Sequence, residues 1–303
     1  AMPDIQKTDA AMPATHPAII RREDYRPPAW FIPTIALDFQ LGLDHTVVRS
    51  TLDVRRSKSA TNGEPLLLDG DGLIPAAVKV DGAPWTDWQM VDGNLQLPLT
   101  DAAHEVEITV ELDPSTNTQL MGLYASQGML CTQCEAEGFR RITFFPDRPD
   151  ILSRYSVRME GDKTAFPILL CNGDKVEEGE GENGRHWAQW NDPWPKPSYL
   201  FALVAGDLVA NTDSFTTRSG KPVELNIWVR DGDLPRTGHA MQALKDSMRW
   251  DEDVYGREYD LGLFNIVAVS DFNMGAMENK GLNIFNSRYI LADPEVATDA
   301  DYD

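Results

Sequence analysis

The sequence predicts a mainly β protein: an amino-terminal β-sandwich or saddle-like β domain over residues 1–207, then the β-rich start of an α+β domain over residues 208–303. Short segments of alternating apolar and polar residues recur from residue 35 to residue 205, with turn dipeptides between them. A helical pattern appears only after residue 236. The length of 303 residues allows about two domains of roughly 150 residues each.

The first domain begins with a proline-rich stretch, residues 1–30, which we expect to run as an extended arm over the surface. From Ile35 onward, apolar residues alternate with polar or small ones, as they do in half-buried strands. Asp81-Gly82 and Asp92-Gly93 are typical of two-residue hairpin turns. Strands are expected at residues 35–43, 48–54, 78–80, 95–99, 106–112, 155–159, 166–170, 186–190 and 199–205.

The second domain is predicted from a change in pattern after residue 207. A strand at 223–229 is followed by a helix at about 237–255, where Met241, Leu244, Met248 and Val254 recur near helical spacing. Gly256 is a natural end for that helix. The fully apolar run 263–269 predicts a buried strand. Strands with a helix between them indicate an α+β domain.

Composition limits the partners. The chain has 48 acidic and 27 basic residues and a formal net charge of −21, which argues against binding to nucleic acid or to an anionic membrane surface. No apolar run approaches the roughly 18 residues of a membrane span, and no signal-peptide pattern is visible in residues 1–20. Three cysteines fit a reducing cytoplasm better than a disulfide framework, so a cytoplasmic location is expected.

Metal and thiol chemistry are not expected within this chain. No two of the five histidines have the i, i+4 spacing of a HEXXH zinc motif, so we expect no metal site here. His104 is expected at the surface and His186 as a hydrogen-bonded structural residue. Cys131 and Cys134 form a CxxC without a second pair, which predicts a loop with two small buried thiols. The acidic run 177–182 is expected to be a solvated hairpin tip.

The most informative segment is 271–281, Asp-Phe-Asn-Met-Gly-Ala-Met-Glu-Asn-Lys-Gly. It places the carboxylate of Glu278 in a run of small and uncharged residues that can lie flat as an edge strand. Such an edge has free N–H and C=O groups for an extended peptide, and a carboxylate there can hold an α-ammonium group. Gly275 and Ala276 would let another backbone come close. For Met274, ordinary core packing remains an alternative.

The Gly-Ala-Met-Glu-Asn sequence at 275–279 resembles the signature of the zinc aminopeptidase N family. The segment 133–140, Gln-Cys-Glu-Ala-Glu-Gly-Phe-Arg, is similar to a second family segment. The resemblance runs from about residue 30 to the end and is closest to the bacterial members. Further stretches that carry it are 140–143, 147–150, 182–187, 216–220, 250–252 and 281–287.

The resemblance implies a substrate site and a fold. Glu135 would join Glu278 in holding the free amine of a peptide, and Gln133 would line the same pocket. Met274 would lie at the pocket for the first side chain, where a flexible thioether suits varied substrates. From composition alone, Glu135 and Glu137 would be solvated turn residues, and Glu137 is still expected to be a surface residue or an arginine partner. Residues 208–303 would begin a thermolysin-like catalytic domain.

The resemblance further implies a zinc-dependent aminopeptidase that removes N-terminal residues from peptides. The HEXXH motif, the remaining zinc ligand and the other catalytic groups would lie beyond Asp303, so no catalytic residue is expected within this chain. The parent enzyme would therefore use zinc, whereas this fragment would hold the amine anchor, bind no zinc and hydrolyse nothing. The parent would be a monomer; strands without their covering helices would favour self-association of the fragment.

A non-catalytic β-rich binding module is the alternative. Five tryptophans could form stacking platforms for a glycan, although core and interdomain packing accounts for them equally well. The segment with Glu278, together with Gln133 and Glu135, favours the aminopeptidase, because glycan binding does not require these residues. The tryptophans are Trp85, Trp88, Trp187, Trp190 and Trp194.

Overall fold

A long, twisted sheet forms most of the first unit in the computed structural model, which describes residues 21–293, 295 and 297–302. Its strand order is β14-β15-β12-β2-β3-β9-β5-β6, with β1 paired to β3. Neighbouring strands are antiparallel except for β12 and β2. The strands are β1 (Trp30–Phe31), β2 (Thr34–Gln40), β3 (Thr46–Arg56), β5 (Ala77–Val80), β6 (Ala83–Pro84), β9 (Ala103–Leu112), β12 (Arg154–Asp162), β14 (Asp174–Glu180) and β15 (Arg185–Asn191).

Two smaller sheets complete this unit. One has the order β4-β8-β7 and the other the order β10-β11-β16-β13. Their strands are β4 (Leu66–Leu68), β7 (Gln89–Val91), β8 (Asn94–Leu97), β10 (Gly122–Ser126), β11 (Met129–Gln133), β13 (Ile168–Cys171) and β16 (Leu203–Gly206). The short 3-10 helices are η1 (Arg22–Asp24), η2 (Pro114–Thr116), η3 (Phe139–Arg141), η4 (Ser198–Leu200), η5 (Asp231–Arg236) and η6 (Ser287–Tyr289).

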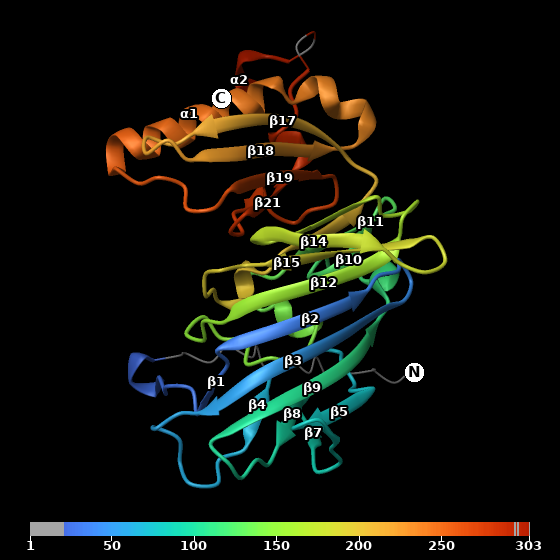
Figure 1. Cartoon of the computed structure of the whole chain (residues 1–303), viewed down its shortest axis with the longest axis vertical. Helices are drawn as coiled ribbons and strands as arrows, with labels where there is room; N and C mark the ends of the chain where they lie inside the picture. Colours follow the sequence, from blue (N-terminus) through green and yellow to red (C-terminus); the bar gives the residue numbers. More distant parts are fainter. Residues whose placement is uncertain (1–20, 294, 296, 303) are drawn as a thin grey trace, which may run out of the picture.

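A five-stranded sheet with one long helix lies at the other end of the molecule (Figure 1). β18 and β19 are parallel, so α1 is the crossover between them. The order β17-β18-β19-β21-β20 leaves β20 at an edge. The elements are β17 (Val209–Thr216), β18 (Pro222–Val229), α1 (Gly238–Tyr255), β19 (Leu263–Val269), β20 (Ala276–Met277), β21 (Leu282–Asn286) and α2 (Asp299–Tyr302).

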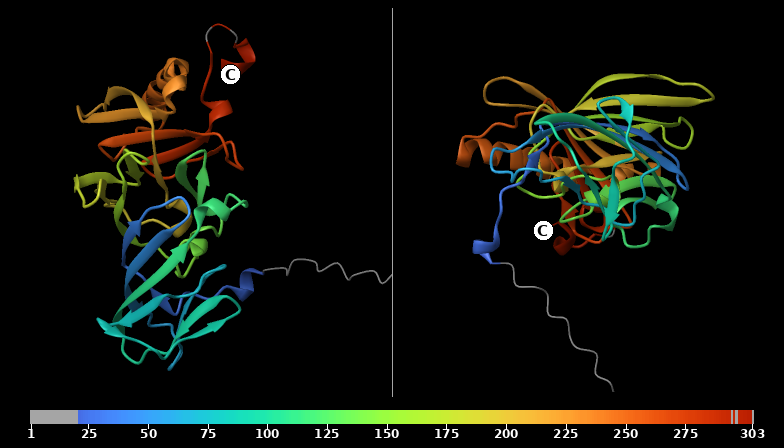
Figure 2. Two further views of the ribbon diagram at one scale, coloured as in Figure 1. Left: turned by 90° about the vertical axis from the view of Figure 1, so that its right-hand side faces the viewer. Right: turned by 90° about the horizontal axis from the view of Figure 1, so that it is seen from below.

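The core continues across both units. On β18, Leu225 and Ile227 face α1 and pack with Met241 and Leu244. The opposite face of the same sheet joins the large core of the first unit, to which Ile284 belongs. The five-stranded sheet is therefore sandwiched between α1 and the β-rich remainder, an order that Figure 2 shows from the side.

The mainly β fold class predicted from the sequence is confirmed. Asp81-Gly82 and Asp92-Gly93 are turns in which all four residues have positive φ, as two-residue hairpins require. The helix ends at Gly256, which has φ +62°. The division at residues 207 and 208 falls between β16 and β17, which belong to different sheets; as a domain boundary it stays a prediction.

Some local expectations were wrong. His104 is buried: Nδ1 lies 2.7 Å from Asp81 Oδ2, and Nε2 accepts the Asp101 N–H at 3.2 Å. The strand expected at 199–205 begins only at Leu203, after η4. Val254 is 54% exposed rather than part of the helix's apolar face. Within the described residues, no helix is long and apolar enough to cross a membrane.

Candidate functional site

The segment after β19 turns back to form the edge strand β20, as the sequence predicted. Ala276 pairs with Phe285 and Met277 with Ile284 of β21. The turn is fixed because the Asn286 N–H donates to the Gly275 carbonyl at 2.8 Å. The Asn286 side-chain amide also donates to the Phe272 carbonyl at 3.2 Å.

Glu278 follows this strand and lines a cavity of about 370 Å³ on the α1 face of the sheet. Because side chains alternate along a strand, Met277 is buried toward the first unit while Ala276 and Glu278 face the other way. The walls of the cavity come from α1, from β21 and from the residues around Tyr289. Glu278 itself is exposed, so its carboxylate is accessible from this cavity.

Gln133 joins the two units. It ends β11, is buried, and donates from Nε2 to the Met274 sulfur at 2.8 Å and to the Glu135 carbonyl at 3.3 Å. Its Oε1 is buried without a hydrogen-bond partner among the described residues. Glu135 lies two residues further on and is exposed. The segments that carry Glu135 and Glu278 therefore meet where Gln133 touches Met274.

Three further hydrogen bonds clamp the start of this segment to the first unit. The Tyr124 hydroxyl donates to the Asp271 carbonyl at 2.7 Å, and the Ser126 hydroxyl donates to Asp271 Oδ2 at 2.6 Å. The Asn273 amide donates to the Gln119 carbonyl at 2.9 Å. Burial raises the pKa of Tyr124 well above its usual range, so the phenol remains a donor.

Glu137 behaves as the sequence predicted. It is exposed, and its Oε1 lies 3.5 Å from Nη2 of Arg140. Nε of Arg140 in turn lies 3.1 Å from Oδ2 of the buried Asp147, and this ion pair ties η3 to the chain that follows it. Residues 139–141, a few positions after the CxxC, form this short 3-10 helix.

The cysteines are three buried free thiols. Burial raises the pKa of Cys131 and of Cys171 from 9.0 to about 12, and that of Cys134 well above 9.0. They are protonated at neutral pH and poor as nucleophiles or metal ligands. Across the residues that the structure describes, no three His, Cys, Asp or Glu side chains are grouped so that they could hold a metal ion.

Most of the five tryptophans considered for a glycan surface pack against other side chains of this chain. Trp190 is 2% exposed and donates to the Leu169 carbonyl. The Arg158 guanidinium lies 4.9 Å above the Trp187 ring. Trp85 and Trp88 pack against the large core, whereas Trp194 is 46% exposed. Packing against the core or beneath Arg158 therefore accounts for Trp85, Trp88, Trp187 and Trp190 without a bound glycan.

Comparison with known proteins gives consistent matches. Residues 84–200 match the Peptidase M1 N-terminal domain and residues 239–303 the Peptidase family M1 domain. The chain is 50% identical over 284 residues to Aminopeptidase N of Haemophilus influenzae, covering 93% of this chain and 32% of that protein. It is 52% identical over 289 residues to Aminopeptidase N of Caulobacter vibrioides, covering 95% of this chain and 33% of that protein.

Among solved structures, aminopeptidase A of Legionella pneumophila in complex with aspartic acid superposes with a TM-score of 0.87. The identity is 30%, and the match covers 92% of this chain and 33% of that one. The chain thus spans about a third of the length of the relatives it matches.

Proposed function

Because the chain belongs to peptidase family M1, we propose that the protein of which it is part is an aminopeptidase that removes residues from the free N-terminus of peptides. The observation that carries this proposal is the junction at Gln133 and Met274, which joins the segments bearing Glu135 and Glu278. Glu278 follows an edge strand and lies in a cavity.

In the proposed site, Glu135 and Glu278 hold the α-ammonium group of the substrate. Two carboxylates near each other are costly when unpaired, and an ammonium between them removes that repulsion. The interior of a peptide chain has no charged amine to offer. Such a site therefore selects the end of a chain and enforces exopeptidase action.

The edge strand would pair with the substrate backbone. Ala276 is on β20, and Gly275 precedes it. A Cβ added to Gly275 would meet the Tyr289 ring at an ordinary distance of 3.5 Å, so the fold itself would tolerate a side chain there. We attribute the small residue to close approach by substrate. Met274 and Gln133 would then border the first side chain of the peptide.

Zinc belongs to the proposal for the whole enzyme. A bound zinc ion supplies Lewis-acid activation of a carbonyl and of water. The described residues of this chain do not fit such an ion, because they provide no suitable ligand cluster. We therefore assign amine binding to this chain and expect it to show no turnover of aminoacyl anilides with added zinc. Turnover above background in a pure preparation would contradict the assignment of amine binding alone to this chain.

Calorimetry on this chain tests the amine anchor. A leucyl tripeptide amide with a free N-terminus is compared with its N-acetylated form. We expect the free amine to bind more tightly, and Glu278→Gln to weaken its binding by roughly tenfold, because a charge-assisted hydrogen bond is lost. Glu177→Gln removes the same charge from an exposed site on β14 and should change nothing. Equal affinity for the two peptides would refute the anchor.

Partners and location follow from the same proposal. The partners would be peptides with a free N-terminus, and neither nucleic acid nor a membrane surface is proposed, given the net charge of −21. Three unpaired buried thiols suit a reducing compartment, so we propose the cytoplasm. A monomeric parent and self-association of this chain alone stay predictions, which sedimentation at several concentrations would test.

A further inference from the structure

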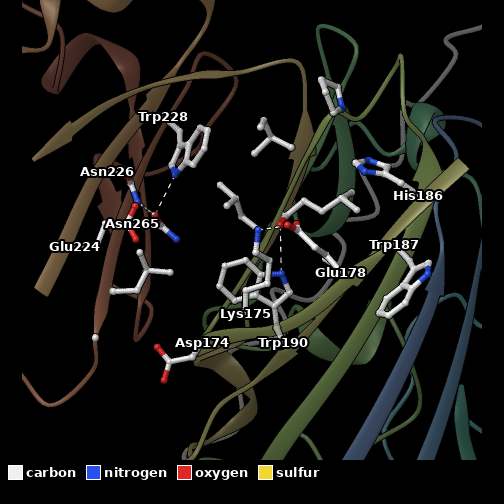
Figure 3. A pocket seen from close by; sticks show the side chains of 17 residues that line it. Asp174, Lys175, Glu178, His186, Trp187, Trp190, Glu224, Asn226, Trp228 and Asn265 are labelled. Carbon is white, nitrogen blue, oxygen red and sulfur yellow. Dashed lines mark hydrogen bonds and ion pairs between the residues drawn. The ribbon is translucent and has the colours of Figure 1, made fainter. Parts of the chain in front are cut away.

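A second cavity lies on the opposite face of the five-stranded sheet from Glu278. It has a volume of about 530 Å³, within the range of roughly 300–1,000 Å³ seen for ligand sites. β18 and β19 form one wall, and β13, β14 and β15 form the other (Figure 3). It therefore opens at the junction of the two units and has no residue in common with the Glu278 cavity.

Among the described residues, the side-chain amide of Asn265 brings a hydrogen-bond donor without a partner to this cavity. Asn265 is 1% exposed, and its Oδ1 accepts from Trp228 Nε1 at 3.0 Å and from Asn226 Nδ2 at 3.1 Å. An indole N–H can only donate, so the oxygen must lie on that side and Nδ2 on the other. Asn226 is fixed in turn, because its Oδ1 accepts from the Thr212 hydroxyl at 2.7 Å.

Asn265 Nδ2 is buried without a hydrogen-bond partner among the residues described. In Figure 3 the amide nitrogen of Asn265 is turned toward the cavity, away from Trp228. A buried donor without an acceptor is costly, so the site favours a ligand that brings an oxygen acceptor to this point.

The charged side chains around the cavity indicate which other groups the ligand carries. Glu178 pairs with Lys175 at 2.7 Å. Asp174 and Glu224 also line the cavity, and neither has an ion-pair partner in the described part of the chain. The half-buried ring of Trp228 lies on the same wall as Glu224. Unpaired carboxylates and an indole together favour a cation on an apolar stem.

We propose that this cavity binds a peptide segment that carries an arginine or lysine side chain. A backbone carbonyl accepts from Asn265 Nδ2, the apolar stem packs on Trp228, and the cation meets Glu224 and Asp174. A sugar fits less well, because Trp190 is 2% exposed and the Arg158 guanidinium lies over the ring of Trp187. The inference goes beyond the proposed aminopeptidase function and does not depend on it, since no terminal amine is involved.

The test uses N-acetylated peptide amides, which cannot use the Glu278 anchor. Acetyl-Leu-Arg-Leu-amide is titrated into the chain by calorimetry and by NMR of the Trp228 indole N–H, which the Trp228→Phe variant assigns. The citrulline peptide has nearly the same shape without the charge, and we expect it to bind about fivefold more weakly. Agmatine has the guanidinium but no carbonyl, and we expect it to bind at least about tenfold more weakly than the arginine peptide.

Two variants locate the binding. Glu224→Gln and, separately, Asp174→Asn should each reduce the preference for arginine over citrulline at least about twofold, with unchanged thermal unfolding. Glu177→Gln is the matched control, because it removes an exposed charge from β14 outside the cavity. The proposal is overturned if the Trp228 signal does not move, if citrulline binds as well as arginine, or if the control weakens binding as much as Glu224→Gln.

Discussion

At the scale of single residues, the candidate site depends on a few hydrogen bonds between distant parts of the chain. Ser126 and Asp271 are 145 positions apart, and Gln133 and Met274 are 141 apart. The sequence identified Gln133, Met274 and Glu278 through local motifs. Ser126 and Tyr124 carry no local signal, because an ordinary strand residue becomes a clamp only when the fold brings its partner close.

The Ser126 clamp can be tested directly. Ser126 is 1% exposed, so Ser126→Ala removes a buried donor to the Asp271 carboxylate and should cost about 1 kcal/mol of unfolding free energy. Because the clamp positions the segment that leads to Glu278, affinity for a free-amine peptide should fall severalfold as well. Urea unfolding and calorimetry measure the two effects. Ser214→Ala, at an exposed serine on β17, is the control. Unchanged stability in Ser126→Ala would show that the clamp contributes nothing.

The buried thiols predict how stability depends on pH. The pKa of Cys131 and of Cys171 rises from 9.0 to about 12 on folding, so both states hold the proton below pH 9. Between pH 9 and 12 the unfolded chain releases protons that the folded chain keeps, and unfolding becomes easier as pH rises. We expect a loss of about 1.4 kcal/mol per buried thiol by pH 10.

Urea unfolding at pH 7, 9 and 10 measures this slope. In Cys131→Ala, the free energy of unfolding should decrease less between pH 9 and 10 than it does in the unsubstituted chain. This holds whatever the substitution does to stability at pH 7. An identical slope in the variant would show that Cys131 does not carry the effect.

At the scale of elements, the sequence predicted those whose signal is local. Strands buried on one face, such as β3 and β9, alternate visibly, and turn dipeptides and the helix end at Gly256 are equally local. β11 was missed because all five of its residues are buried, which removes the alternation. β17 was missed for the opposite reason, since most of it is exposed or half-buried at a sheet edge.

The end of α1 offers a test at this scale. Gly256 has φ +62°, a left-handed conformation that a Cβ disfavours, and its N–H caps the helix carbonyls of Asp251 and Glu252. Gly256→Ala should therefore lower unfolding free energy by about 1 kcal/mol. Gly232→Ala is the control, because that glycine has open space around it and no positive φ. Thermal unfolding compares the two; equal effects would contradict the capping argument.

At the scale of the whole molecule, the two units share one core. Val267, Leu282 and Ile284 of the five-stranded sheet belong to the same buried cluster as the interior of the first unit. The clamps at Asp271 and the contact between Gln133 and Met274 cross the same boundary. A change in the hydrophobic pattern suggested a boundary between the two units. The sequence could not show that the core continues across this boundary, because the pattern indicates only local periodicity and not which sheet faces pack together.

A shared core predicts that the two units unfold in one cooperative transition. Ile284 is fully buried, so Ile284→Ala should cost about 2–5 kcal/mol and shift the whole transition. Calorimetry gives the number of transitions, and NMR reports loss of structure in each unit through the indole signals of Trp190 and Trp228. Val254→Ala, at an exposed helix position, should leave the transition unmoved. Two separate transitions, with Ile284→Ala shifting only that of the five-stranded sheet, would show that the units are independent despite their common core.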